Sequence, residues 1–171
     1  NGMLRKDRLL DIIKNFILWS EDSKILAAYH QYFGVKKAIH STEKAIDNRT
    51  GKAGLLWHTQ GSGKSFSMVF YAGNMIKVLN NPSIVVVTDR NDLDNQLFTT
   101  FAKCSDYLKQ EPAQIESRQD LNEKLEKLND CGNILVFTDL LSGSPFNVLS
   151  MESSPQIYFN ALYPINVPSV S

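Results

Sequence analysis

Apolar residues recur at helical spacing near the start of the chain. Leu9, Ile12, Ile13 and Phe16 fall on one face, with Arg and Lys side chains around them. An apolar stripe of this width is typical of an amphipathic helix packed on a core. The pattern therefore predicts a helix over residues 9–19.

The next segment predicts a second helix. Residues 20–23 (SEDS) break the first pattern and can cap a helix that starts at about Lys24. Gly34 interrupts this second pattern before it resumes, and residues 47–51 (DNRTG) have the composition of a turn.

After the turn the pattern changes to short apolar runs. Such runs occupy residues 53–57 (AGLLW), 83–87 (SIVVV) and 133–137 (NILVF). Helical patterns lie between them at about residues 65–79, 93–101 and 119–128. Alternating strands and helices predict an α/β fold, in which a parallel sheet carries helices on both faces. The β-branched run at 83–87 predicts a strand buried on both faces.

Gly61, Ser62, Gly63, Lys64 and Ser65 form a glycine-bearing loop between the first predicted strand and its helix. Glycines let backbone N–H groups approach a phosphate closely, and the helix N-terminus adds partial positive charge. A Lys and a Ser at these positions can reach the β- and γ-phosphates and hold Mg²⁺. The loop, with the preceding Gln60, is therefore predicted to bind nucleotide and Mg²⁺.

One position departs from the full phosphate-loop pattern, because His58 stands where the first Gly is usual. The alternative is a glycine turn with a surface Lys. The strand–loop–helix context favours the phosphate loop.

Two further segments carry candidate chemistry. Residues 88–96 (TDRNDLDNQ) follow the second predicted strand, where ligands bind in open α/β sheets, and Asp89 is a candidate metal carboxylate. A polar loop and a helix capped by Asp92 are the alternative. Upstream, Gln31 lies between aromatic residues, and its amide can pair with adenine. A half-buried helix face explains that segment equally well.

Composition narrows the function classes. The 18 basic and 18 acidic residues cancel, which excludes a uniformly basic nucleic-acid coat. The first 64 residues are net basic, whereas residues 132–171 contain no Lys or Arg. The two Cys residues form no disulfide framework, so reduced thiols and a cytoplasmic location are expected. No apolar run is long enough to span a bilayer, and the N-terminus does not have the pattern of a signal peptide.

Three motifs together resemble the restriction (R, or HsdR) subunit of type I restriction–modification enzymes. They are AYHQY at residues 28–32, LWHTQGSGKS at 56–65 and VVVTDRNDLDNQL at 85–97. The resemblance runs from about Leu9 to about Cys131. It implies an ATP-hydrolysing helicase-like motor that translocates duplex DNA, works with modification and specificity subunits, and cuts with a separate nuclease domain.

The resemblance also implies roles for individual residues. Gln31 would contact adenine, and the loop from Gly61 to Ser65 would hold the phosphates and Mg²⁺, with Lys64 also catalytic. Thr88 and Arg90 would track the DNA backbone. The chain would hold the start of the first RecA-like domain. It contains no DEAH-type motif, no second RecA-like domain and no PD…ExK nuclease signature, so the isolated chain is expected to turn over little ATP.

The tail resembles a different family. Residues 137–147 (FTDLLSGSPFN) and 164–168 (PINVP) resemble the mannose-class enzyme IIA of the bacterial sugar phosphotransferase system. That family needs a histidine after an N-terminal strand, which this chain lacks. We expect residues 134–137 to add a strand, and residues beyond about Ser142 to cover a sheet edge or lie on the surface.

These observations divide the chain into three parts. Residues 1–50 are a helical lead-in with the adenine-reading motif, residues 51–131 a RecA-like phosphate-loop core, and residues 132–171 a third strand with a divergent tail. Because the two resemblances meet at about residue 132, a fusion or junction there is an alternative to a native tail. A phosphotransferase component and a nucleotide-binding module without turnover are the alternatives to an ATP-driven motor.

Overall fold

The computed structural model gives the arrangement of most of the chain. It describes residues 5–21, 23–50, 52–57, 59, 61–88, 91–115, 120, 123, 134–138 and 157–163.

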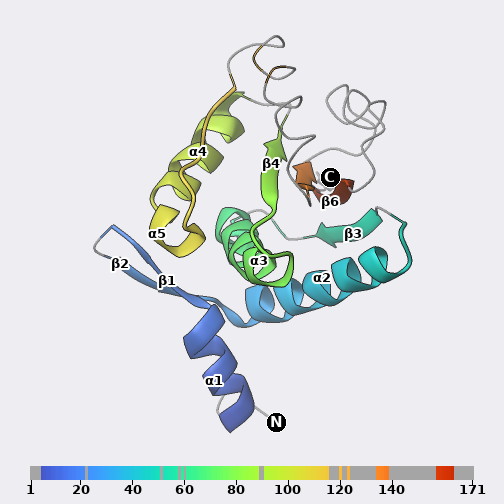
Figure 1. Ribbon diagram of the computed structural model, residues 1–171. Coiled ribbons are helices and arrows are strands. Elements are labelled where there is room, and N and C mark those ends of the chain that lie inside the picture. The colour runs from blue at the N-terminus through green and yellow to red at the C-terminus, as the bar shows by residue number, and fades with distance from the viewer. Residues whose placement is uncertain are drawn as a thin grey trace, which may run out of the picture.

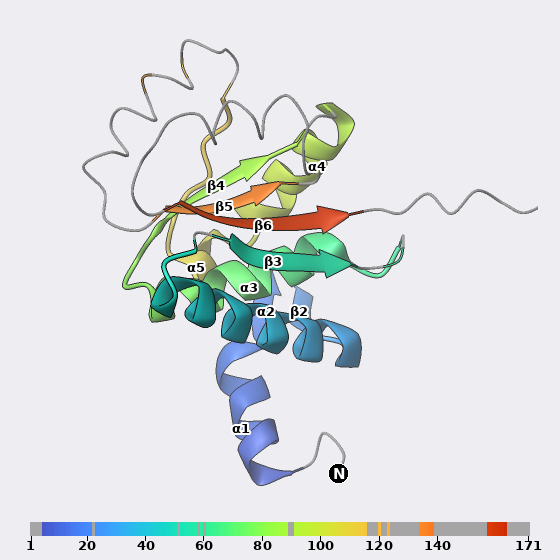
Figure 2. The same cartoon turned by 90° about the vertical axis from the view of Figure 1, so that its right-hand side faces the viewer.

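A four-stranded parallel sheet forms the centre of the fold. Its strands are β3 (Lys52–Trp57), β4 (Ser83–Val87), β5 (Ile134–Thr138) and β6 (Ile157–Tyr163). The spatial order is β3-β6-β5-β4, and each neighbouring pair is parallel (Figure 2). The three strands predicted from the apolar runs are confirmed, and the fold is mixed α/β.

Two long helices lie on one side of this sheet (Figure 2). Helix α2 (Tyr29–Asp47) packs against β3 and against α3 (Lys64–Val78). The middle of α3 is buried from Ser67 to Met75, as expected for a helix that is apolar on most of its surface. Helix α2 continues through Gly34, so the predicted interruption there is wrong. A Gly inside a helix costs only about 1 kcal/mol, which tertiary packing readily offsets.

Helix α4 (Asn91–Ala102) and the short α5 (Ser105–Leu108) follow β4 and contact α3 (Figure 1). Because α4 begins at Asn91, Asp92 lies inside the helix and is not its cap. Of the helix predicted over 119–128, the structure describes only residues 120 and 123, and both are helical.

The N-terminal segment differs from its prediction. Helix α1 spans Lys6–Asn15, and an antiparallel hairpin follows, made of β1 (Ile17–Ser20) and β2 (Ser23–Leu26) (Figure 1). The predicted extension of the first helix to Trp19, and a second helix from Lys24, are therefore wrong. Leu18 is buried and Trp19 is exposed, an alternation with the period of two that defines a strand.

The tail also differs from its prediction. Strand β6, which holds the only described residues beyond Ser142, lies between β3 and β5, so this part of the tail does not cover an edge of the described sheet. Strand β4 is one of the two edge strands of the described sheet, and its five residues are only half-buried. The prediction that residues 83–87 are buried on both faces is therefore wrong, because β-branched residues suit a half-buried pleated surface as well.

An aromatic core joins Phe16, which lies between α1 and β1, to α3 and the sheet. The ring of Phe16 lies 5.8 Å from that of Phe70 on α3, and Tyr71 packs edge-on against Phe137 of β5 at 5.4 Å. These four side chains are at most 2% exposed. Burial of large aromatic side chains strongly stabilises a core. Helix α3 is thus held near its middle by aromatic contacts on two sides.

Candidate nucleotide-binding site

The glycine loop lies between the end of β3 and the start of α3. Gly61 and Gly63 both take left-handed backbone angles, with φ of 76° and 74°, a region that L residues with side chains rarely adopt. Within the loop, the Ser62 N–H and hydroxyl both donate to the Thr59 carbonyl, at 3.3 and 2.6 Å. The chain therefore turns sharply before the helix begins.

Lys64 and Ser65 are the first two residues of α3, and both are half-buried. The first N–H groups of a helix have no partner within it, and the helix dipole adds positive charge at the same place. An ammonium and a hydroxyl thus stand beside free backbone donors, the arrangement that binds phosphate.

The start of α2 contacts this loop through two adjacent side chains. The His30 Nε2 lies 2.9 Å from the Ser62 carbonyl oxygen, and the Gln31 Nε2 donates to the Gly63 carbonyl at 2.9 Å. The Gln31 Oε1 accepts from the Ala28 N–H at 2.8 Å. This last bond satisfies one of the free donors at the N-terminus of α2, as in one half of a capping box. Gln31 therefore ties the start of α2 to the start of α3.

Gln31 is almost completely buried, at 6% exposure. A Cβ on Gly63 would lie 2.8 Å from the Gln31 Nε2, so this close approach needs a glycine. The amide has two N–H donors and an oxygen with two lone pairs, and the bonds to Gly63 and Ala28 use one of each. Adenine contact by Gln31 stays a prediction.

The structure brings only some of the predicted residues together. Gln31, Gly61, Ser62, Gly63, Lys64 and Ser65 form the loop and its support. Thr88 follows β4, three strand spacings from β3, or roughly 14 Å at the usual spacing. It therefore lies apart from the phosphate loop, at the same end of the sheet. Gln60, His58, Asp89 and Arg90 lie outside the described residues, as does the enzyme IIA-like stretch from Asp139.

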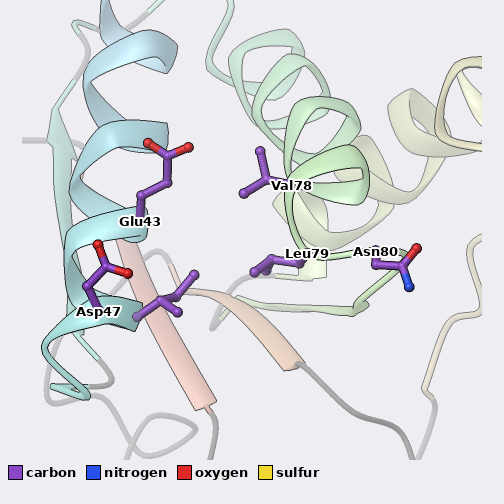
Figure 3. A pocket seen from close by; sticks show the side chains of 6 residues that line it. Glu43, Asp47, Val78, Leu79 and Asn80 are labelled. Carbon is purple, nitrogen blue, oxygen red and sulfur yellow. The ribbon is translucent and has the colours of Figure 1, made fainter.

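Sequence reasoning missed His30 as a support of the loop. Its position beside Gln31 was the available signal, but only the fold shows that α2 begins next to Ser62. A separate pocket of ≈ 440 Å³ lies at the other end of the two helices (Figure 3). Its lining is Glu43, Ile46, Asp47, Val78, Leu79 and Asn80. It adjoins the last residues of α2 and α3, so it is distinct from the phosphate loop.

Other classes of site find no support in the described part of the chain. No group of three His, Cys, Asp or Glu residues there could hold a metal ion. Burial raises the pKa of the Cys104 thiol and outweighs the opposing hydrogen bond with Ser20, so this thiol stays protonated and unreactive at neutral pH. Among the described helices, none has the length and apolar character of a membrane span.

Comparison with known proteins bears on the loop directly. The family model described as SWI2/SNF2 ATPase matches residues 30–141, which include His30, the phosphate loop and β5. The match therefore extends past residue 131, the approximate end of the segment that resembles R subunits.

Individual relatives agree with this match. The type I restriction enzyme HindI endonuclease subunit of Haemophilus influenzae is 48% identical over an alignment of 146 positions, which covers 81% of this chain and 14% of the relative. The putative MjaIXP endonuclease subunit of Methanocaldococcus jannaschii is 31% identical over an alignment of 177 positions including gaps, which covers 88% of this chain and 17% of the relative. The chain thus spans less than a fifth of the length of these relatives. It belongs to the SWI2/SNF2 ATPase family and is homologous to the endonuclease subunits of type I restriction enzymes.

Proposed function

We propose that the chain is the ATP-binding part of a RecA-like motor domain in a type I restriction endonuclease subunit. In the whole subunit this motor couples ATP hydrolysis to translocation along duplex DNA. The observation that carries the proposal is the GSGKS loop at the N-terminus of α3, supported from α2 by two side-chain bonds. A parallel sheet with the loop at the end of one strand supports the RecA-like fold.

Each residue of the loop has a distinct task in this proposal. Gly61 and Gly63 keep the backbone open, so that N–H groups face the phosphates. Lys64 neutralises the β- and γ-phosphates, and the Ser65 hydroxyl is a ligand for Mg²⁺. Bound Mg²⁺ would supply further neutralisation of the phosphate charge. Gln60 completes the loop, and Gln31 selects adenine through the part of its amide that is still free.

DNA would bind beside this site. Thr88 stands at the end of β4, at the same end of the parallel sheet as the phosphate loop but three strands away from it. With Arg90 it would contact the phosphate backbone, which positions a protein on DNA without reading sequence. The modification and specificity subunits of a type I complex are the proposed protein partners.

Binding and turnover are separable in this chain. Its sequence contains no DEAH motif, and phosphoryl transfer depends on groups that position the metal and the attacking water. We propose that the chain by itself binds nucleotide without appreciable turnover. DNA-stimulated hydrolysis by the purified chain near 1 s⁻¹, the lower end for phosphoryl-transfer enzymes, would contradict this part of the proposal.

A nucleotide titration of the purified chain tests the proposed binding. Isothermal titration calorimetry should give one ATP per chain in the presence of Mg²⁺, weaker binding when EDTA removes the metal, and weaker binding of GTP than of ATP. Equal heats for ATP and for a buffer injection would contradict the proposal. Equal affinities for ATP and GTP would contradict only adenine selection.

A further inference from the structure

Two consecutive side chains of α2 hold two consecutive carbonyl groups of the phosphate loop. His30 bonds to the Ser62 carbonyl and Gln31 to the Gly63 carbonyl, both at 2.9 Å. The two partners are 32 residues apart along the chain in each case. The pairing therefore depends on the fold, and we call these two residues the α2 clamp.

The geometry of the peptide unit gives the clamp a consequence for phosphate binding. In a trans peptide the C=O and the N–H of the next residue share one plane and point in opposite directions. Drawing the Ser62 carbonyl toward α2 therefore turns the Gly63 N–H away from α2. By the same geometry, the bond from Gln31 to the Gly63 carbonyl turns the Lys64 N–H away from α2. These two N–H groups belong to the loop proposed to hold the phosphates.

The Gly63 peptide is fixed from more than one direction. Its carbonyl also accepts from the Ser67 N–H at 3.1 Å and from the Ser67 hydroxyl at 3.3 Å. The Ser62 carbonyl, by contrast, is bonded to His30, whose side chain is exposed. Loss of an exposed side chain removes little core packing, so substitution of His30 should change mainly the orientation of the loop.

We propose that His30 is a positioning residue for the phosphate loop. Through its Nε2 it holds the Ser62–Gly63 peptide with the Gly63 N–H directed toward the bound phosphates. The proposal rests on the proposed function of this loop. It assigns His30 a role toward the phosphate group and none toward the base.

Ligand binding separates this role from a structural one. His30→Ala should weaken both ATP·Mg²⁺ and inorganic tripolyphosphate with Mg²⁺ by about three- to tenfold, the range for loss of one hydrogen bond. His30→Gln should restore most of the affinity, because its Nε2 is the same number of bonds from Cα. The matched control is His40→Ala, an exposed residue on the same helix whose Nδ1 lies 3.9 Å from a Glu43 oxygen. It should bind like the unaltered protein.

A measurement without nucleotide tests the geometry itself. In NMR hydrogen exchange, His30→Ala should speed exchange of the Ser62 amide, which donates to Thr59 in the folded loop, while core amides of α3 stay protected. Unchanged Ser62 exchange, or unchanged tripolyphosphate affinity in a chain that binds it, would overturn the role of His30. Failure of the unaltered chain to bind either ligand would overturn the proposed function, and the role of His30 with it.

Discussion

At the scale of single residues, the site depends on a contact between a glycine and a buried amide. Gly63 has a positive φ of 74°, and any side chain there would meet the Gln31 amide. Gln31 in turn bonds to backbone groups of Ala28 and Gly63, the residues that directly precede α2 and α3. The residue predicted to read adenine therefore also supports the loop, and substitution of Gln31 should have two separable effects.

The ratio of ATP to GTP affinity isolates the adenine-reading role of Gln31. Gln31→Ala should weaken both nucleotides, because the loop loses support, and should weaken ATP more, because the amide no longer reads the base. The ratio should therefore move toward one in competition titrations. His30→Ala is the matched control, since it should lower both affinities and leave their ratio unchanged. An unchanged ratio in Gln31→Ala would limit Gln31 to supporting the loop.

At the scale of elements, the end of α1 is bonded to α3, which begins at the phosphate loop, and to α5. The Asn15 carbonyl accepts from Tyr107 Oη of α5 at 2.6 Å and from Asn74 Nδ2 of α3 at 3.2 Å. Its side-chain oxygen accepts from Lys77 Nζ of α3 at 2.8 Å. A partly buried polar network of this kind restrains the relative position of its elements, so α1, α3 and α5 should behave as one unit.

Gly73 tests the fit between α3 and α5. A Cβ at Gly73 would lie 2.1 Å from Tyr107 Cε1, and the Tyr107 hydroxyl is held by Asn15. Gly73→Ala should gain about 1 kcal/mol of helix propensity but lose about 1–3 kcal/mol to overpacking. We expect the free energy of unfolding in urea to fall by about 1 kcal/mol.

The control for the Gly73→Ala variant removes the aromatic ring of Tyr107, which lies against this position. In a Tyr107→Ala background, Gly73→Ala should no longer destabilise the protein, because neighbouring substitutions are not additive when they share a contact. The same loss of stability in both backgrounds would show that the ring of Tyr107 does not limit this position.

The contact between α1 and α2 gives a prediction for alkaline pH. Tyr32 Oη donates to Asp11 Oδ2 at 2.9 Å, and burial together with this bond raises the pKa of Tyr32 to about 12. The unfolded value is about 10, so this stabilisation is complete below pH 10 and is lost as the pH rises through about 12. Asp11→Ala should lower the pKa of Tyr32, measured by NMR of ¹³Cζ-labelled tyrosine.

At acidic pH, Asp11 of the same Tyr32–Asp11 pair determines how the stability of the protein changes. Burial raises the pKa of Asp11, but hydrogen bonds from Asn15, Tyr32 and Lys36 outweigh it and leave the pKa below its usual value. The stabilisation by Asp11 is therefore present above about pH 4 and is lost as the pH falls through the lowered pKa.

The control for the Tyr32 titration is Asp106→Ala, which changes an exposed position on α5 and should leave the pKa of Tyr32 unchanged. The same Tyr32 pKa in the unaltered protein, Asp11→Ala and Asp106→Ala would contradict a hydrogen bond between Tyr32 and Asp11.

At the scale of the whole molecule, local patterns predicted the elements next to the candidate site better than the fold around them. The run at 83–87 and the GSGKS loop are continuous in sequence, and β4 and the start of α3 match them. The hairpin was missed because the apolar positions of Phe16 and Ile17 extend the preceding helical pattern. Strand β6 was missed because its pairing partners, β3 and β5, lie far from it in sequence. The support from His30 was missed for the same reason.

The central claim is that the loop before α3 binds the phosphates of ATP through Lys64, and calorimetry of one variant tests it most directly. Lys64→Ala should weaken ATP·Mg²⁺ binding by about 2–3 kcal/mol, roughly 30- to 150-fold in Kd, because a charged hydrogen bond to phosphate is lost. Lys37→Ala removes the same charge from an exposed position on α2 and should bind like the unaltered protein. Equal ATP·Mg²⁺ affinity in Lys64→Ala, Lys37→Ala and the unaltered chain would contradict the account.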